Sequence, residues 1–281
     1  ILIGRNAGVG GSGKMDACVV IGGFALDATG ANGKTGIVSI GYETMTNVTT
    51  GGSVAIGHRA AKDLTTGASN TAVGYEAMEN NSTGGSNTAL GFHALYGSSG
   101  NSTNSNVAVG KESLYSISSG GYNVALGDTA LYGLTSGNYS VGIGYQAGYY
   151  NIGSNNVLIG YGAGRGAAGQ STAGAMTAVG RESFASVTTG ANNIGLGYRA
   201  GYAVTTGASN IAIGIEAMRN AVSPASSVAI GTYAGYNIKA GGTGIVHIGH
   251  NAGTYASASN NTFVGHESGK GGTTSAPFSS G

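Results

Sequence analysis

Residues 52–57 read GSVAIG and residues 226–231 read SSVAIG, and variants of this hexapeptide occur along the whole 281-residue chain. The last glycine of each copy gives a common point of alignment, from Gly4 to Gly265. Successive copies lie 16 to 20 residues apart, most often 17. Self-similarity at a short, nearly fixed period is typical of solenoids, in which each repeat forms one coil. The glycines that we expect to mark positive-φ turns or close backbone approaches include Gly57, Gly74, Gly91, Gly110, Gly127, Gly144, Gly197, Gly214 and Gly231.

The three residues before each glycine alternate in size. An aliphatic residue directly precedes the glycine in every copy, and Val, Ile or Thr stands three residues before it. A small residue lies between these two in eleven of the sixteen copies. This two-residue period predicts a short strand with branched side chains on one face and small ones on the other. Because so short a strand is not stable alone, we expect the copies to stack in register as a parallel sheet.

The predicted fold is therefore all-β, a parallel β-roll or β-solenoid of about 16 coils with ~17 residues per coil. Residues 1–270 all fit the repeat and are expected to form a single β-solenoid repeat domain. Residues 271–281 are expected to form an irregular C-terminal end that continues into an unseen region. The chain begins at Ile1 inside a repeat, which suggests that it is a piece of a longer protein.

The composition excludes several classes of protein. Glycine supplies 56 residues and proline only 2, without the G-X-Y period of collagen. Charged residues make up 8% of the chain, and its 12 Lys and Arg are not clustered, so we expect no nucleic-acid partner. No apolar run approaches the roughly 20 residues of a membrane helix, so we expect no membrane insertion in this segment. Cys18 is the one cysteine and forms no intrachain disulfide.

The small residues at the strand centre suggest a close contact between sheets, because alanine and glycine cannot fill a thick core. We expect this column to be the subunit contact of a homotrimeric fibre, intertwined or side by side. A monomeric solenoid with a tight second wall is the alternative. In the trimer, bulky residues near both ends of the column, such as Leu2 and Phe263, would plug a channel between the subunits. The predicted subunit-contact column comprises Ala55, Ala72, Ala89, Ala108, Ala125, Ala212 and Ala229.

The repeat resembles a known family. Residues 52–57 and 226–231 are similar to the YadA-like head repeat of trimeric autotransporter adhesins, and longer copies such as SNTAVGYEAM at 69–78 resemble repeats of bacteriophage tail fibres. This resemblance implies a homotrimeric, left-handed parallel β-roll that serves in attachment. The repeat is longer than that of adhesin heads, which favours a phage or viral tail-fibre shaft that gives reach, rigidity and multivalent binding to a host surface. A bacterial surface adhesin head or extracellular filament is the alternative.

The resemblance also implies where the chain works and what it contacts. The expected location is the virion, as a tail fibre, or the cell surface. The expected partners are further copies of the chain and a glycan or protein on the host cell.

Tyrosines recur at the fifth position after the glycine in four successive copies. Tyr96, Tyr115, Tyr132 and Tyr149 should therefore form an aromatic ladder. Such a ladder either stabilises the sheet edge by ring contacts or offers a platform for the sugar rings of a receptor glycan.

Six of the seven glutamates lie two residues after the aligned glycine, and Arg59 and Arg199 interrupt their file. This alternation predicts a surface charge ladder rather than catalytic carboxylate pairs. His247 lies in the small column, so three copies of it would meet on a trimer axis, either as a metal site or as a ring of neutral imidazoles. We expect no metal, no cofactor and no catalytic residues, since phosphate-loop and nucleophile-elbow motifs are absent. A carbohydrate-active solenoid enzyme is the alternative.

Overall fold

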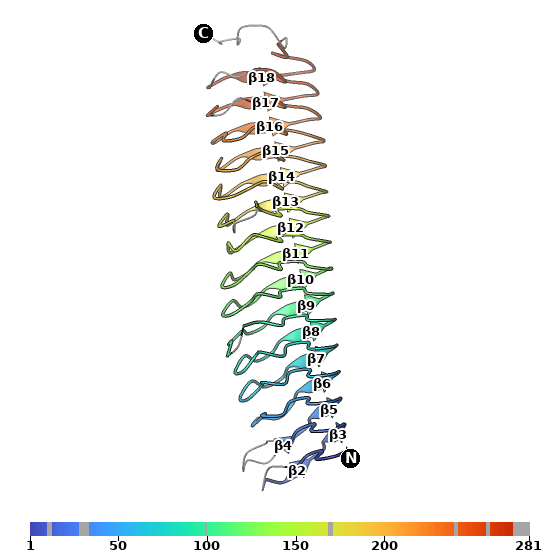
Figure 1. The fold of residues 1–281 in the computed structure, drawn as a ribbon. Helices are drawn as coiled ribbons and strands as arrows, with labels where there is room; N and C mark the ends of the chain where they lie inside the picture. Colours follow the sequence, from blue (N-terminus) through green and yellow to red (C-terminus); the bar gives the residue numbers. More distant parts are fainter. Residues whose placement is uncertain are drawn as a thin grey trace. The chain divides into compact units, whose positions relative to one another are not determined.

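The chain forms a parallel β-solenoid (Figure 1). The computed structural model describes residues 1–9, 13–27, 34–98, 100–167, 171–238, 241–256 and 259–271, and all regular structure among them is strand. The chain divides into two compact units, 1–139 and 140–281, and the single repeat domain expected from the sequence stays a prediction. Because each coil of a solenoid contacts only its neighbours, the same repeat runs through both units. The predicted irregular end, 271–281, lies outside the described residues except for Gly271.

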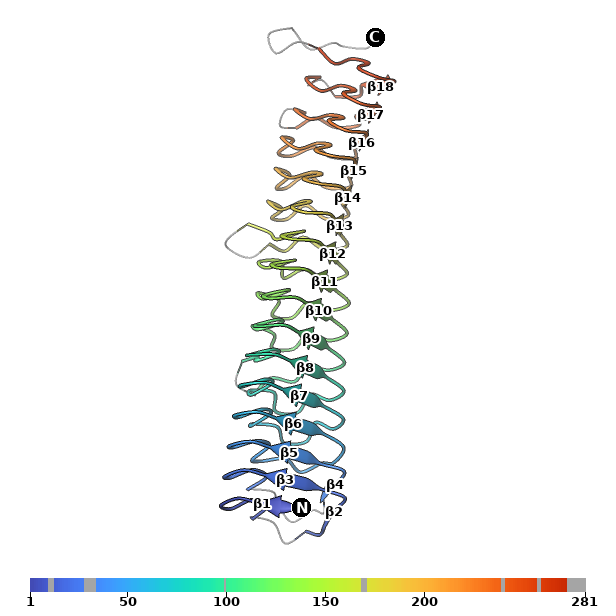
Figure 2. The same ribbon diagram turned by 90° about the vertical axis from the view of Figure 1, so that its right-hand side faces the viewer.

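In the first unit, eight short strands pair in chain order, each parallel to the next (Figure 2). They pair in register, one repeat apart, so that Ala72 lies opposite Ala89. Two further strands, β2 (Met15–Asp16) and β4 (Lys34–Thr35), pair with each other on another wall of the coil. The eight strands are β1 (Leu2–Ile3), β3 (Val19–Ile21), β5 (Val38–Ile40), β6 (Val54–Ile56), β7 (Thr71–Val73), β8 (Thr88–Leu90), β9 (Val107–Val109) and β10 (Val124–Leu126).

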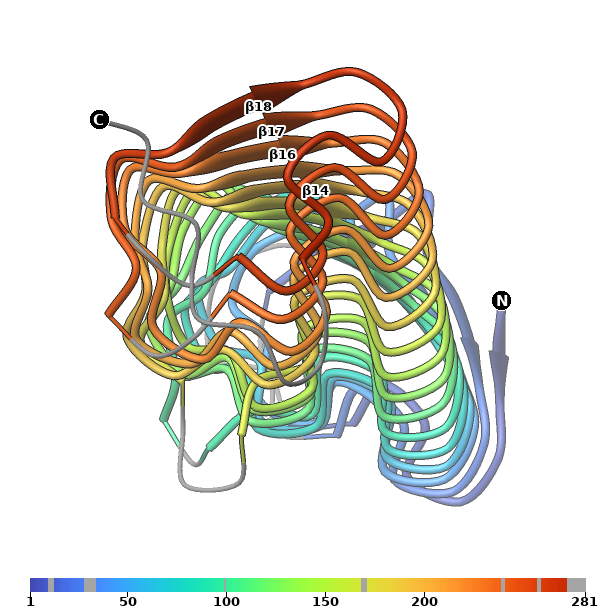
Figure 3. The same ribbon diagram turned by 90° about the horizontal axis from the view of Figure 1, so that it is seen from above.

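The second unit repeats this arrangement. Viewed along the stack, its coils lie over one another, with the strands on one side and the turns on the others (Figure 3). The pairing is again parallel and in register, as for Ala212 and Ala229. Its strands are β11 (Val141–Ile143), β12 (Val157–Ile159), β13 (Thr177–Val179), β14 (Ile194–Leu196), β15 (Ile211–Ile213), β16 (Val228–Ile230), β17 (Val246–Ile248) and β18 (Thr262–Val264).

The aligned glycine ends each strand in a conformation that other residues avoid. Gly57 has φ +137° and Gly110 has φ +127°. A Cβ on Gly57 would lie 2.2 Å from the carbonyl oxygen of Gly74, one coil further on. Positive φ and close backbone approach therefore both require glycine here. The nine glycines singled out from the sequence all have φ between +122° and +141°.

The small strand-centre column faces the interior of each coil. All seven alanines assigned above to a subunit contact are fully buried within the single chain. A side chain without exposed surface cannot touch another subunit, so that assignment is wrong. The opposing wall consists of the residues three and four positions after the glycine, such as Ala94 and Leu95, which are also fully buried. The tight second wall, which was the alternative, is the arrangement found.

Large strand-centre residues are matched by glycine on the opposing wall. A Cβ on Gly164 would lie 2.4 Å from Leu158 Cδ2, and one on Gly269 would lie 2.3 Å from the Phe263 ring. A Cβ on Gly8 would likewise lie 2.9 Å from Leu2 Cδ2. These bulky residues therefore fill space inside their own coil and do not plug a channel between subunits. In these coils a large residue on one wall is paired with glycine on the other, as close packing requires.

A ladder of asparagines crosses the interior four residues before the aligned glycine. Asn106 donates from its backbone N–H and from Nδ2 to Asn87 Oδ1, at 2.9 and 3.3 Å, and Nδ2 also reaches Gly120 O at 3.0 Å. Asn123 makes the same bonds to Asn106 Oδ1, at 3.0 and 3.1 Å. A slip in strand register would leave these buried amides without partners, so the ladder helps to fix the register.

Candidate functional site: the ladder face

The turn after each aligned glycine presents side chains to solvent at positions one, two and five, whereas positions three and four are buried. Equivalent residues of successive coils form vertical files. We call the surface made by these three files the ladder face. In the first unit its members include Tyr42, His58, Tyr75 and Phe92 at position one, Glu43, Arg59, Glu76 and His93 at position two, and Lys62, Glu79, Tyr96, Tyr115 and Tyr132 at position five.

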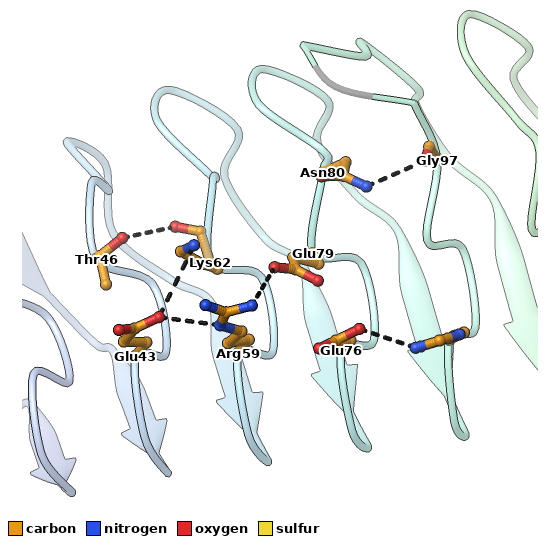
Figure 4. Close-up of polar contacts among 9 residues, drawn as sticks. Glu43, Thr46, Arg59, Lys62, Glu76, Glu79, Asn80 and Gly97 are labelled. Atoms are coloured by element: carbon orange, nitrogen blue, oxygen red, sulfur yellow. Dashed lines mark hydrogen bonds and ion pairs between the residues drawn. The ribbon is translucent and has the colours of Figure 1, made fainter.

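The second file of the first unit carries alternating charge, as the sequence predicted (Figure 4). Arg59 Nε donates to Glu43 Oε2 at 3.0 Å, and His93 Nε2 lies 2.9 Å from Glu76 Oε2. Lys62 Nζ, from the fifth file, lies 3.8 Å from the same Glu43 oxygen. Each acid thus contacts a base one coil away, which removes the repulsion that a file of like charges would suffer.

Glu43 in the second file and Glu79 in the fifth file differ in proton affinity. Burial raises the pKa of Glu43, but hydrogen bonds from Tyr42 and Arg59 outweigh it and hold the pKa below its ordinary value. The pKa of Glu79 is raised, first by burial and then by the nearby charge of Glu76. Arg59 Nη1 lies 3.7 Å from Glu79, too far to offset the burial. These shifts are those of a paired surface network.

Four successive residues of the first file form a continuous stack of rings in the first unit. Tyr42, His58, Tyr75 and Phe92 follow one another with centroid separations of 5.5, 4.9 and 5.5 Å and interplanar angles of 20° or less. Tyr42, Tyr75 and Phe92 are each more than 40% exposed. Because each ring covers the face of the next, the stack offers mainly ring edges and hydroxyl groups to solvent.

The predicted tyrosine ladder occupies the fifth file. Tyr96, Tyr115 and Tyr132 stack at 5.1 and 5.0 Å, within 5° of parallel. Both faces of Tyr115 are covered, so a sugar ring has access to its edge and hydroxyl but not to its face. Tyr149 belongs to the second unit, where its ring meets that of Tyr150 edge-on at 4.6 Å.

In the second unit the ladder face interleaves arginine with tyrosine. The guanidinium of Arg181 lies 5.3 Å from the Tyr161 ring and 5.9 Å from the Tyr198 ring, one coil away on either side. Arg199 lies over Tyr198 and Tyr202, at 5.0 and 5.2 Å. Guanidinium groups stack on aromatic faces, so these contacts continue the ladder with cations in place of rings.

His247 does not reach a subunit axis. Its side chain is fully buried inside its own coil, where a Cβ on Gly253 would lie 2.3 Å from the ring. Neither ring nitrogen has a hydrogen-bond partner, and burial lowers the pKa of His247 to about 4. No group of three His, Cys, Asp or Glu among the described residues could hold a metal ion. Three copies of His247 therefore cannot share a metal ion or form a ring of imidazoles.

The branched strand residues face outward. We call the surface made by the first and last residue of each main strand the aliphatic face. Leu90 and Leu126 are nearly half exposed in the first unit, and Ile194 and Leu196 are more than one-third exposed in the second. Rows of Val, Thr, Ile and Leu thus lie on the surface of both units, while alanine is inside.

The ladder face and the aliphatic face thus carry the files of outward side chains in both units. A hollow of about 390 Å³ lies at the first coil, lined by Ile1, Leu2, Met15, Ala17 and Cys18, away from the charged files. No described segment is a helix long and apolar enough to cross a membrane. No family model matches the chain, and neither the curated proteins nor the solved structures include one that matches it.

Sequence reasoning missed one element of these surfaces and one of the interior. His58 completes the first ring stack, and the signal for it was its place between Tyr42 and Tyr75 in the aligned repeats. The asparagine ladder was also missed, although asparagine stands four residues before the glycine in eight copies.

Proposed function

We propose that the chain is a segment of a self-assembling attachment fibre of the phage or viral tail-fibre kind, whose copies associate through the aliphatic face. The observation that carries the proposal is the outward position of the branched strand residues. A soluble monomer rarely exposes a contiguous apolar patch larger than a few hundred Å².

The area of this face is large enough for a stable contact. Each unit has eight main strands, and each strand contributes two outward residues. Burying a Val, Leu or Ile side chain is worth about 1.5–3 kcal/mol at about 25 cal/mol per Å², so outward residues that are mostly less than one-third exposed offer on the order of 20–30 Å² each. The sum is roughly 300–500 Å² per unit, so the strands of both units together offer an area comparable to the ~800 Å² that each partner contributes to a standard interface.

Association through this face leaves the ladder face for display. The two surfaces belong to different parts of the coil, the strand and the turn that follows it. Identical ladder faces on three copies would present each binding group several times, and multivalent contact raises avidity by about 10²–10⁴ without new contacts. Homotrimeric assembly, implied by the resemblance to adhesin and tail-fibre repeats, satisfies both requirements. The hexapeptide GSVAIG at 52–57 equally favours a bacterial surface adhesin head, which would use the same two surfaces.

The test separates assembly from folding. Ile194→Asp/Leu196→Asp places two charges on the aliphatic face, whereas Thr206→Asp/Val222→Asp alters exposed residues on the turns of the same unit, outside both faces. We expect light scattering to give a trimer for the wild type and the turn variant, and a folded monomer for the strand variant. The strand variant should also lose at least 100-fold in apparent affinity for cell-envelope material. A monomeric wild type, or equal effects of the two variants, would contradict the proposal.

A further inference from the structure

The second unit contains two arginines that no acidic group neutralises. Residues 140–281 carry six Lys and Arg against three Glu, whereas residues 1–139 carry six against eight acids. Arg199 and Arg219 pair with Glu182 and Glu216, at 2.6 and 3.5 Å. Arg165 and Arg181 are exposed and form no ion pair. Every Asp and Glu of the chain is among the described residues, so their two charges have no carboxylate partner in this chain.

These two arginines border a place where the ladder face is short of side chains. Arg165 is at position five of the β12 coil, and Arg181 is at position one of the next coil. Between them the second file holds Gly162, and a Cβ there would meet only Glu182 Cγ, at 3.8 Å. One coil after Arg165, the residue at position five is Ala185, which is buried. Gly162 and Ala185 are both buried and carry no large side chain, whereas Arg165 and Arg181 are exposed. We call this stretch of the ladder face, with the two arginines that border it, the notch.

The notch has groups that suit an oxyanion attached to a sugar. Guanidinium presents N–H donors in a planar fork that matches carboxylate, sulfate or phosphate. Tyr161 is exposed beside Arg181, and its ring holds the guanidinium in place at 5.3 Å. The one carboxylate nearby, Glu182, is already bound by Arg199 Nε. A fixed guanidinium loses less side-chain freedom on binding, which favours affinity.

We infer that the Arg165–Arg181 notch binds the acidic groups of a surface polysaccharide. This inference rests on the proposed attachment function and names the class of its ligand. Nucleic acid fits less well, because tracking a phosphate backbone needs a groove of many cations and open ring faces. Here two cations are unpaired, and guanidinium groups cover both the Tyr161 and the Tyr198 ring.

The experiment measures binding of the purified chain to immobilised polysaccharides. The probes are a sulfated heparin-type oligosaccharide, a carboxylated polyuronate, neutral dextran and duplex DNA of equal length. We expect binding to both acidic polysaccharides and none to dextran, with inorganic sulfate competing only at high concentration. Equal binding to dextran, or tighter binding to DNA than to the polysaccharides, would overturn the inference.

Matched charge variants locate the site. Arg165→Gln/Arg181→Gln removes the unpaired charges, and Arg59→Gln/Arg219→Gln removes the same charge from arginines that are paired with Glu43 and Glu216, away from the notch. We expect the first variant to lose at least 10-fold in affinity and about two units of salt slope, and the second to stay within 3-fold. Both sites are at the surface, and circular dichroism confirms that each variant is folded. Equal losses would refute the assignment to the notch.

The same variants distinguish this inference from the proposed function. If Ile194→Asp/Leu196→Asp leaves the mass unchanged while the notch variant alone loses polysaccharide binding, the fibre proposal fails and the site stands. If assembly responds as expected but both arginine variants bind equally well, the site fails and the fibre proposal stands.

Discussion

Exchange of volume between the two walls of a coil predicts how the core responds to substitution. In the β9 coil, Ala108 at the strand centre faces the wall that carries Leu114, and both are fully buried. Ala108→Leu adds three carbon atoms to a filled space and should destabilise the fold by about 1–3 kcal/mol. Leu114→Gly removes the opposing side chain and should cost about 2–5 kcal/mol.

The double variant recreates a pair that the chain already contains. Leu158 and Gly164 occupy the same two positions of the β12 coil, and the Leu158 side chain fills the space that a Cβ on Gly164 would need. Leu114 has φ +51°, a conformation that glycine adopts without strain. We therefore expect Ala108→Leu/Leu114→Gly to be within about 1.5 kcal/mol of the wild type, with a favourable coupling of about 2–3 kcal/mol.

Urea unfolding followed by circular dichroism measures the four stabilities, and light scattering measures the mass of each variant. A double variant as unstable as the sum of the single ones would show that the two residues do not share one space. A stable Ala108→Leu variant that fails only to assemble would return the alanine column to a subunit contact, and would refute the inward assignment.

Three further outcomes follow from the buried polar groups and the charge file. Asn106→Ala should cost about 2–4 kcal/mol of unfolding free energy, because it removes the bond that Asn106 donates to Gly120 O and the one that it accepts from the Asn123 backbone N–H. Exposed Ser102→Ala should change the unfolding free energy by less than about 0.5 kcal/mol, as urea titration would show. The pKa of His247 is lowered to about 4 in the folded protein, so the unfolded chain is protonated at a higher pH than the folded one. The free energy of unfolding should therefore be full above about pH 6.5 and fall by up to about 3 kcal/mol toward pH 4. His247→Phe should remove this dependence on pH. A flat difference between the two proteins from pH 7 to pH 4.5 would contradict it. Arg59→Gln should lower the free energy of unfolding by less than about 1 kcal/mol. Arg59 Nε lies 3.0 Å from Glu43 Oε2, but its side chain is 37% exposed, so solvent weakens the pair. A loss of melting temperature as large as that of a core variant would contradict this.

The repeat carries enough information to predict the coil, the parallel register and the charge ladder. Glycines such as Gly57 mark each strand end, and the spacing of Glu43 and Arg59 places them in one file of adjacent coils. These predictions depend only on which residues are equivalent, and equivalence can be seen in the aligned sequence.

Which face of the strand is inside could not be predicted in the same way. Alternation shows that the two faces differ, and the usual expectation places branched residues inside. The coil is so narrow that a methyl group at Ala108 already fills the interior, so the branched residues lie outside. The pairing of Leu158 with Gly164, and of Phe263 with Gly269, contains this information, because such compensation requires the two positions to face each other.

The chemistry of single residues was the least predictable part. His247 is of a type that binds metals, but only the space left by Gly253 shows that its ring lies inside one chain. Tyr115 was predicted to lie in a ladder that either stabilises the sheet edge or offers a platform for sugars, and only the rings stacked on both its faces show that its edge alone is accessible.

In-register stacking of one repeat per coil can be tested by disulfide trapping. Ser69, Ser86 and Ser105 are equivalent residues of three successive coils, so adjacent ones should have Cα atoms about 4.8 Å apart and alternate ones about twice that. A disulfide requires roughly 4.4–6.8 Å. In a Cys18→Ser background at low protein concentration, Ser69→Cys/Ser86→Cys should form an intrachain bond on mild oxidation, and Ser69→Cys/Ser105→Cys should not. Failure of the adjacent pair, or equally ready closure of the alternate pair, would contradict the coil assignment.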